Sequence, residues 1–304
     1  MTELSLDTNY SFPLWVDNTA ITDFKSCKKK SEWATFFKFE PNPGSVHLHA
    51  GKAFARGLEV ARKAFYVEGL DEELAVGQGL MALWKEYGDY ETPEDSYKSW
   101  LGMTHAFIHY MTEWKMGEDY ITPLPIGDKK AIEFSFAIPI EVNHPETGDP
   151  ILLSGRADMF AEYQNSAWVE DDKTTKGIGP QWANQWPLRG QFMGYTWAGR
   201  EYGHKLKGAI VRAVSVQKTQ NKVAEAIIPI SDSLLDKWYT SLIFTVKEMI
   251  RAWENKEFPH DFGHACSGFG GCDYAQLCLK NDPSKWLMYY KERTWNPMED
   301  DHAA

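Results

Sequence analysis

The sequence has few cysteines, no long apolar run and a deficit of basic residues. Four of its 304 residues are cysteine, and 32 Lys and Arg stand against 43 Asp and Glu, a net charge of −11. This balance argues against a protein that coats nucleic acid through a basic surface, although it allows local basic groups beside clustered acids. Two groups of basic residues are either local phosphate-binding surfaces or ordinary solvated faces: Lys25, Lys28, Lys29 and Lys30, and Lys205, Lys207, Arg212 and Lys218.

The absence of a membrane-spanning run and of a cleavable secretion pattern predicts an intracellular protein. We expect it in the cytoplasm of a bacterium or of a phage-infected host, without a membrane partner. No internal repeat or low-complexity segment occurs. With 43% hydrophobic and 25% charged residues, the chain can form one large core with a small appendage.

Periodicity and breaker residues predict an α/β protein with a mixed sheet wrapped by helices. We expect an extended arm at 1–20, and a packed strap followed by a disordered tail at 286–304. The predicted strands are 132–142, 151–163, 167–173, 208–217 and 223–230, and the predicted helices are 21–39, 50–68, 71–87, 94–116, 181–202 and 231–255.

The strands 151–163 and 167–173 are separated by the turn-forming residues 164–166 and therefore predict a hairpin. Charged residues lie in and at the end of these strands, where burial is costly unless a partner or a metal compensates the charge. These residues are Asp158, Asp171, Asp172 and Lys173.

Side chains alternate along a strand, so Asp171 and Lys173 point to one face and Asp172 to the other. A carboxylate and an ammonium group can therefore lie beside one site, with a divalent cation between Asp158 and Asp171. Asp172 would then be structural.

Asp158 followed on a hairpin by Asp171-x-Lys173 resembles the PD-(D/E)XK nuclease superfamily, and Thr174 after the triplet is typical of its RecB-like exonuclease branch. The resemblance implies a restriction-endonuclease-like core, in which a mixed central sheet is flanked by helices. It also implies a phosphodiester hydrolase that uses Mg²⁺ or Mn²⁺. Asp158, Asp171 and the backbone carbonyl of Asp172 would hold the metal, and Lys173 would orient or help deprotonate the attacking water.

Two further positions match this branch. Gln191 and Tyr195 match its Gln-x-x-x-Tyr motif, lie four residues apart on one helical face and would point at the substrate strand. Glu133 resembles the acid that often precedes the hairpin and contributes to the metal shell. The alternative for Glu133 is an exposed residue at the start of a strand.

The first-helix motif of the branch is broken. Aligned on Gly51, its Gly-x-x-x-His would require a histidine where Ala55 stands. Glu59, one turn further along the same face, and His49, at the start of the helix, are candidate replacements as metal ligands. A helix cap or a solvated side chain is the alternative role for either residue.

One cysteine near the N-terminus and three close together near the C-terminus can converge on a metal centre, because a Gly-rich bend separates two of them. Disulfides are disfavoured in a reducing cytoplasm, and small buried apolar residues are the remaining alternative. Ligand count alone does not separate structural zinc from an iron–sulfur cluster. The cysteines are Cys27, Cys266, Cys272 and Cys278.

This one-plus-three layout resembles iron–sulfur RecB-like nucleases, including the AddB nuclease domain and CRISPR-adaptation nucleases, in which a [4Fe–4S] cluster joins the N- and C-terminal segments. The five residues 267–271 depart from the two that those relatives usually have, so zinc stays an alternative. The centre would be structural rather than catalytic. We expect one nuclease domain over 1–304, with 21–40 and 260–282 forming a cysteine-cluster subdomain around the core 45–258.

The resemblance implies a bacteriophage-type deoxyribonuclease, an exonuclease on single-stranded DNA or DNA ends, acting in recombination, repair or replication. A helicase, an annealing protein or a single-strand-binding protein is the partner such enzymes often have. Two alternatives stay open: a catalytically inactive DNA-binding or adaptor protein that keeps the nuclease fold, and a zinc-stapled structural protein of a virion or replisome. The broken helix motif and the acidic net charge favour the inactive protein, and the intact hairpin residues oppose it.

Overall fold

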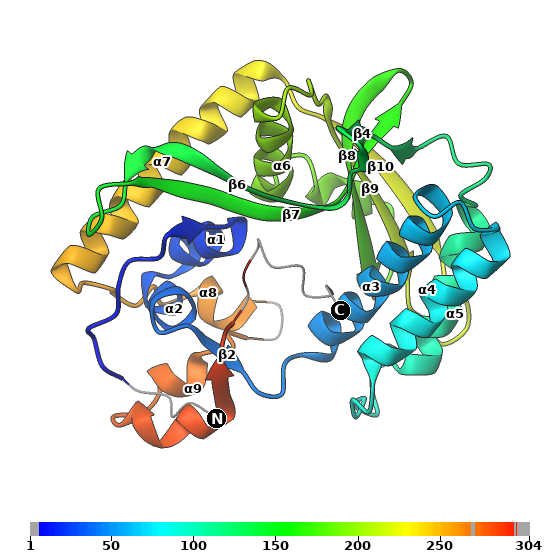
Figure 1. Ribbon diagram of the computed structural model, residues 1–304. Helices are drawn as coiled ribbons and strands as arrows, with labels where there is room; N and C mark the ends of the chain where they lie inside the picture. Colours follow the sequence, from blue (N-terminus) through cyan, green and yellow to red (C-terminus); the bar gives the residue numbers. More distant parts are fainter. Residues whose placement is uncertain (1–5, 269–270, 295, 297–304) are drawn as a thin grey trace. The chain divides into compact units, whose positions relative to one another are not determined.

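The chain passes repeatedly between two structural units (Figure 1). The structure, a computed structural model, describes residues 6–268, 271–294 and 296. The first unit lies within 1–44, 135–155 and 236–304, and the second within 45–134 and 156–235. Both segments of the predicted cysteine subdomain belong to the first unit.

Three helices form one layer of the second unit: α3 (Val46–Tyr66), α4 (Glu72–Tyr87) and α5 (Trp100–Glu113). Each begins at a residue whose side chain accepts a backbone N–H of the first turn, namely Ser45, Asp71 and Ser99. Their apolar faces form one buried cluster that includes Phe54, Leu58, Leu83, Met103 and Phe107. Burial of these large side chains stabilises the layer by roughly 1.5–3 kcal/mol each.

The sheet of the second unit is mixed. Strand β8 (Ser166–Thr175) pairs antiparallel with β7 (Pro150–Tyr163) and parallel with β9 (Gly208–Ser215), which pairs antiparallel with β10 (Val223–Pro229). Figure 1 shows α3, α4 and α5 on one side of β8–β10 and α6 (Gly190–Glu201) on the other. Every residue of β9 is buried, as is typical of a strand covered on both faces. The short elements are β3 (Thr122–Pro123), β4 (Pro125–Ile126), β5 (Lys129–Lys130) and the 3₁₀ helix η2 (Trp182–Gln185).

The first unit contains most of the long helix α7 (Asp232–Asn255), which begins in the second unit. Strand β6 (Ile132–Asn143) from Ser135 on and the first part of β7 also belong to it, and β6 pairs with β7. Its aromatic cluster joins segments far apart in sequence, including Trp33, Phe39, Tyr274 and Tyr290. Its other elements are β1 (Trp15–Val16), α1 (Asn18–Ser26), α2 (Lys28–Ser31), the π-helix η1 (Glu32–Phe36), β2 (Phe39–Pro41), α8 (His264–Ser267), α9 (Ala275–Cys278), η4 (Pro283–Tyr289) and β11 (Tyr290–Glu292).

The N-terminal prediction was wrong in two respects. The segment expected as an extended arm contains β1 and the start of α1, because Asp17 caps the helix and α1 therefore begins at Asn18. The helix expected over 21–39 is interrupted at Cys27, whose backbone is extended (φ −164°, ψ 118°), and it ends at Phe36.

The helix expected over 181–202 is also divided. The 3₁₀ helix η2 ends at Gln185, and α6 begins at Gly190. Pro187 lies between them, and a proline inside a helix lacks the N–H and clashes with the preceding turn. The helix predicted over 94–116 is shorter for a different reason, since Ser99 caps it at Trp100.

The C-terminal strap is packed, because β11 pairs antiparallel with β2 and Tyr290 is buried. The tail predicted to be disordered lies mostly outside the described residues. Among the helices of the described part, none is both long and apolar enough to span a bilayer.

Candidate active site

The site lies where β7 and β8 separate. The ladder between the two strands ends at the pair Met159 and Glu170, whereas β8 continues alongside β9 through Thr175. The backbone N–H of Asp172 therefore lies beyond the backbone ladder with β7, and the side-chain carboxylate of Asp158 accepts it at 2.8 Å. This hydrogen bond holds Asp158 next to the predicted triplet.

Asp171 and Lys173 lie on the α6 side of β8. The Nζ of Lys173 forms an ion pair with Asp171 Oδ2, and Gln191 on α6 donates to Asp171 Oδ1 at 3.0 Å. The same amide donates to the hydroxyl of Tyr195 at 3.1 Å. The structure therefore brings together the predicted hairpin residues and the predicted Gln-x-x-x-Tyr pair.

Negative charge at this site is under-compensated. Burial raises the pKa of Asp158 well above its usual range, and repulsion by Asp171 and Glu133 raises it further. Burial also raises the pKa of Asp171, against the attraction of Lys173. For Lys173, burial lowers the pKa, but attraction by Asp171 and Asp158 outweighs burial and leaves the pKa raised.

Glu133 belongs to the same group of acids. Its backbone has a φ of 50°, a left-handed conformation that is unfavourable for a residue with a side chain and is frequent at functional sites. Burial and repulsion by Glu59 raise its pKa to about 8. Glu133 also raises the pKa of both Asp158 and Tyr195, so it is close to the predicted hairpin site rather than isolated at a strand start.

The opposite face of β8 carries two acids that are paired. Asp172, whose side chain is 3% exposed, accepts from Arg62 on α3 at 2.6 Å and from the hydroxyl of Tyr110 on α5. Arg62 also contacts Glu170 at 3.1 Å. The side chain of Asp172 is therefore committed to the helix layer, in keeping with its predicted structural role.

Arg212 extends this network. It contacts Glu170 at 3.4 Å, Asp119 at 2.5 Å and Glu225 at 2.9 Å, and it is 1% exposed. The idea that Arg212 belongs to a basic surface was therefore wrong, because β9 has no exposed face.

The two candidate first-helix ligands differ in their surroundings. Glu59 forms ion pairs with Arg56 and Lys63 at 2.7 Å each, and it raises the pKa of Glu133, so it lies near the acids. His49 is the fourth residue of α3 rather than its first. Its Nε2 lies 2.8 Å from the carbonyl oxygen of Tyr87, and its ring stacks on Tyr90.

Within the described residues, no group of three or more His, Cys, Asp or Glu side chains is arranged to hold a metal ion. Asp158, Asp171 and Glu133 nevertheless lie close together, and the ammonium group of Lys173 only partly compensates their negative charge. Mg²⁺ is commonly bound through one or two carboxylates, water and substrate phosphates rather than by a complete protein cage. The two hairpin carboxylates and the carbonyl of Asp172 fit that mode of binding.

The four cysteines lie in the first unit as free thiols. The backbone of Asp261 links two of them, because its N–H donates to Cys27 Sγ at 3.4 Å and its carbonyl accepts from Cys266 Sγ at 3.8 Å. Burial raises the pKa of Cys278, and the thiols of Cys27 and Cys266 raise it further. Cys278 in turn raises the pKa of Cys272, which burial has already raised.

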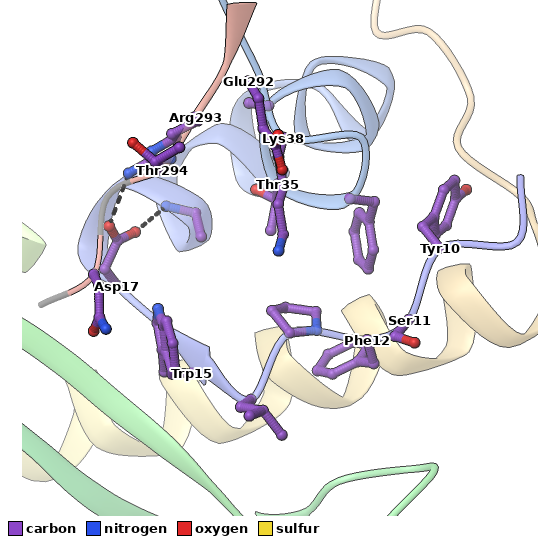
Figure 2. A pocket seen from close by; sticks show the side chains of 16 residues that line it. Tyr10, Ser11, Phe12, Trp15, Asp17, Thr35, Lys38, Glu292, Arg293 and Thr294 are labelled. Atoms are coloured by element: carbon purple, nitrogen blue, oxygen red, sulfur yellow. Dashed lines mark hydrogen bonds and ion pairs between the residues drawn. The ribbon is translucent and has the colours of Figure 1, made fainter. Parts of the chain in front are cut away.

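A cavity of about 690 Å³ lies in the first unit, between the N-terminal segment and the start of the C-terminal strap (Figure 2). Its walls combine the aromatic side chains of Tyr10, Phe12 and Trp15 with polar groups. An ion pair of 3.3 Å joins Asp17 and Arg293 at one end. None of the predicted catalytic residues is among its described lining residues.

Sequence analysis missed two residues of the second unit. For Arg62 there was one indirect indication in the sequence: Asp172 points away from the catalytic face, and a buried acid there requires a basic partner. Lys98 had none, because its contact with Thr174 joins segments that are far apart in sequence.

Comparison with known proteins agrees with this geometry. The family model of the PD-(D/E)XK nuclease superfamily matches residues 19–279. A protein from Eubacterium rectale that is assigned as an exonuclease shares the fold, with a TM-score of 0.50, 12% identity and coverage of 83% of this chain and 86% of that one.

An alkaline exonuclease from Laribacter hongkongensis has a TM-score of 0.27 and 12% identity, with 68% of this chain and 95% of that chain covered. A search of curated proteins gave no match. The family match covers most of the chain and includes every residue of the hairpin site. The chain belongs to the PD-(D/E)XK nuclease superfamily.

Proposed function

We propose that the protein is a metal-dependent deoxyribonuclease, and more specifically an exonuclease on single-stranded DNA or DNA ends. The observation that carries the proposal is the gathering of Asp158, Asp171 and Lys173 on one side of β8, with unbalanced negative charge. The Eubacterium rectale neighbour, which shares the fold, is assigned as an exonuclease, and this supports the exonuclease mode.

When bound, Mg²⁺ or Mn²⁺ would polarise the scissile phosphate and stabilise the leaving oxygen. Asp158, Asp171 and the carbonyl of Asp172 would hold the ion, with Glu133 or Glu59 completing its shell. Lys173 orients the attacking water and offsets the charge that develops on the phosphate. Gln191 fixes the orientation of Asp171 through its hydrogen bond.

We further propose that the chain is a RecB-like member of the bacteriophage type. The Gln191 and Tyr195 pair, hydrogen bonded beside Asp171, supports this assignment. A helicase, an annealing protein or a single-strand-binding protein in recombination, repair or replication is the partner class we propose.

We propose that Cys27, Cys266, Cys272 and Cys278 hold a [4Fe–4S] cluster, with structural zinc as the alternative. Cys27 and Cys266 raise the pKa of the Cys278 thiol, and Cys278 raises that of Cys272. These effects and the hydrogen bonds of the Asp261 backbone to two of the thiols support a shared centre. Because binding at such a centre adds directly to folding stability, the metal would act on the first unit rather than on the reaction.

The test is anaerobic purification with iron, zinc and sulfide analysis, followed by digestion of end-labelled single-stranded DNA with Mg²⁺ or Mn²⁺. We expect a brown protein that shortens the DNA, and loss of shortening in Asp171→Ala and Lys173→Ala. Activity retained in both variants would contradict the nuclease assignment. Inert wild-type protein that still binds DNA would instead support the inactive adaptor, which the absence of the helix histidine at Ala55 favours.

A further inference from the structure

The second unit has a cavity of its own beyond the C-terminal end of β8, the strand that carries Asp171 and Lys173. It has a volume of about 540 Å³ and is lined by the segments that follow β8 and β9, by the first residues of α3 and by the segment that precedes α5. Because β8 and β9 are parallel, both end at the same edge of the sheet, the edge at which α/β proteins bind ligands. Lys98 and Lys176 line it, together with His47 and Gln217.

Lys98 is the unusual member. It is 4% exposed, and its Nζ donates to two neutral groups, the hydroxyl of Thr174 at 2.8 Å and the carbonyl of the same residue at 3.2 Å. Within the described part of the chain, no carboxylate forms an ion pair with Lys98 or Lys176. A buried ammonium group without an anionic partner is costly, so a bound anion would stabilise Lys98.

The charges around the cavity favour an anion. Asp95 is the one acid among the described lining residues, against two lysines and a histidine. Burial and repulsion by Lys176 together lower the pKa of Lys98 to about 8. Burial likewise lowers the pKa of His47, and the two lysines add to this effect.

Lys98, which lines the cavity, contacts a residue next to the reaction site in sequence. Thr174, which accepts the Lys98 hydrogen bonds, directly follows Lys173 on β8. Tyr97, half exposed at 51%, lines the same cavity and offers a ring on which a nucleobase can stack. A phosphate attached to a nucleoside fits these groups better than a free anion does.

We propose that this cavity is a phosphate-binding site in which Lys98 and Lys176 hold a phosphate of the DNA strand that the hairpin site cuts. The inference rests on the proposed nuclease function and adds a substrate contact to it. Lys98 and Lys176 are binding residues, and the site takes either an internal phosphodiester or a terminal 5′-phosphate.

The test measures binding separately from cleavage. Fluorescence anisotropy with a short single-stranded oligonucleotide, carrying either a 5′-phosphate or a 5′-hydroxyl, is recorded without divalent metal at several salt concentrations. The variants are Lys98→Gln, the exposed Lys176→Gln as a substitution that does not disturb the core, and Lys85→Gln on α4 as the charge-matched control. Thermal unfolding is measured for each variant.

We expect Lys98→Gln and Lys176→Gln each to weaken binding by about tenfold and to reduce the slope of log affinity against log salt by about 0.7. Lys85→Gln should leave both quantities unchanged. Equal losses with both oligonucleotides indicate an internal phosphate, and a loss confined to the phosphorylated one indicates a terminal phosphate. Unchanged affinity and slope in Lys176→Gln and in folded Lys98→Gln would overturn the proposal.

The two proposals fail differently. If the wild-type protein binds DNA through Lys98 and Lys176 but never shortens it with Mg²⁺ or Mn²⁺, the phosphate site stands and the nuclease function falls. If the wild-type protein cuts and the lysine variants bind DNA normally, the nuclease function stands and the phosphate site falls.

Discussion

The two faces of β8 carry buried acids with different partners, although burial also raises the pKa of Glu170 on the α3 face, to about 7. On the α6 face, Asp171 shares one lysine with Asp158, and burial and repulsion raise the pKa of both acids. On the α3 face, Asp172 and Glu170 share Arg62, and a second arginine also reaches Glu170. Neighbouring acids of β8 therefore have different partners, because a different helix covers each face of the strand.

This difference separates the acids suited to metal binding from those that stabilise the fold. A paired acid contributes its charge to packing, whereas an under-compensated pair can accept a cation that the fold does not supply. Asp172 contributes to both faces, since its side chain pairs with Arg62 and its N–H binds Asp158. The Arg62 ion pair therefore also positions the catalytic face.

The largest expected effect is on cleavage. Asp158→Asn removes one of the two hairpin carboxylates, and we expect DNA cleavage to fall by about 10³-fold or more because the metal loses a ligand. Thermal stability should not fall, since the change removes a repelling buried charge. Glu162→Gln, at an exposed position of the same strand, is the control and should cleave normally. Full cleavage activity in Asp158→Asn would contradict a catalytic role for the acids on the α6 face.

The next effect is on stability. Arg62→Met leaves Glu170 and Asp172 without their shared cation, and we expect the free energy of unfolding to fall by about 3–5 kcal/mol, measured by urea titration. Lys52→Met, on the same helix as Arg62, breaks an exposed ion pair with Glu86 on α4 and should cost less than about 1 kcal/mol. Equal costs for the two variants would mean that the network on the α3 face contributes no more than a surface ion pair.

The proposed cysteine centre should affect stability but not take part in cleavage directly. Cys278→Ser should abolish the bound iron or zinc and lower the unfolding temperature, because a structural centre contributes its binding free energy to folding. Asp158→Asn should keep the full metal content of that centre while losing cleavage. Metal analysis and thermal unfolding of both variants check this prediction, and Cys278→Ser protein with unchanged metal content would contradict it.

The smallest expected effect is a pH dependence of DNA binding. Lys98, with its pKa lowered to about 8, loses its charge as the pH rises through and above that value, and DNA binding should weaken. Lys176, His47 and Asp95 also face the cavity. The roughly tenfold advantage of wild-type protein over Lys98→Gln near pH 7 should therefore shrink near pH 9.5. Anisotropy titrations at the two pH values check this, and a constant ratio would contradict it.

Local patterns were sufficient to predict much of the fold. The hairpin of β7 and β8, the pair β9 and β10, and α7 all lie within a few residues of their predicted bounds, because alternation and capping act over short distances. Pro187 shows where periodicity misleads, since the apolar pattern continues across a break in the helix.

The site was predictable only in part. Asp158, Asp171 and Lys173 share one hairpin, so their proximity follows from strand pairing. Arg62 and Lys98 reach the same strand from α3 and from the segment before α5, which requires the tertiary fold. The functional roles of all these residues stay predictions until they are measured.

The most direct test of the account compares cleavage by Asp171→Asn with cleavage by Asp172→Asn. Both changes remove one charge from adjacent buried positions of β8, and digestion of end-labelled single-stranded DNA with Mg²⁺ or Mn²⁺ is the measurement. We predict that Asp171→Asn is inactive but stable, and that Asp172→Asn keeps measurable cleavage while unfolding more easily. Similar cleavage by the two variants would contradict the assignment of catalysis to one face of β8.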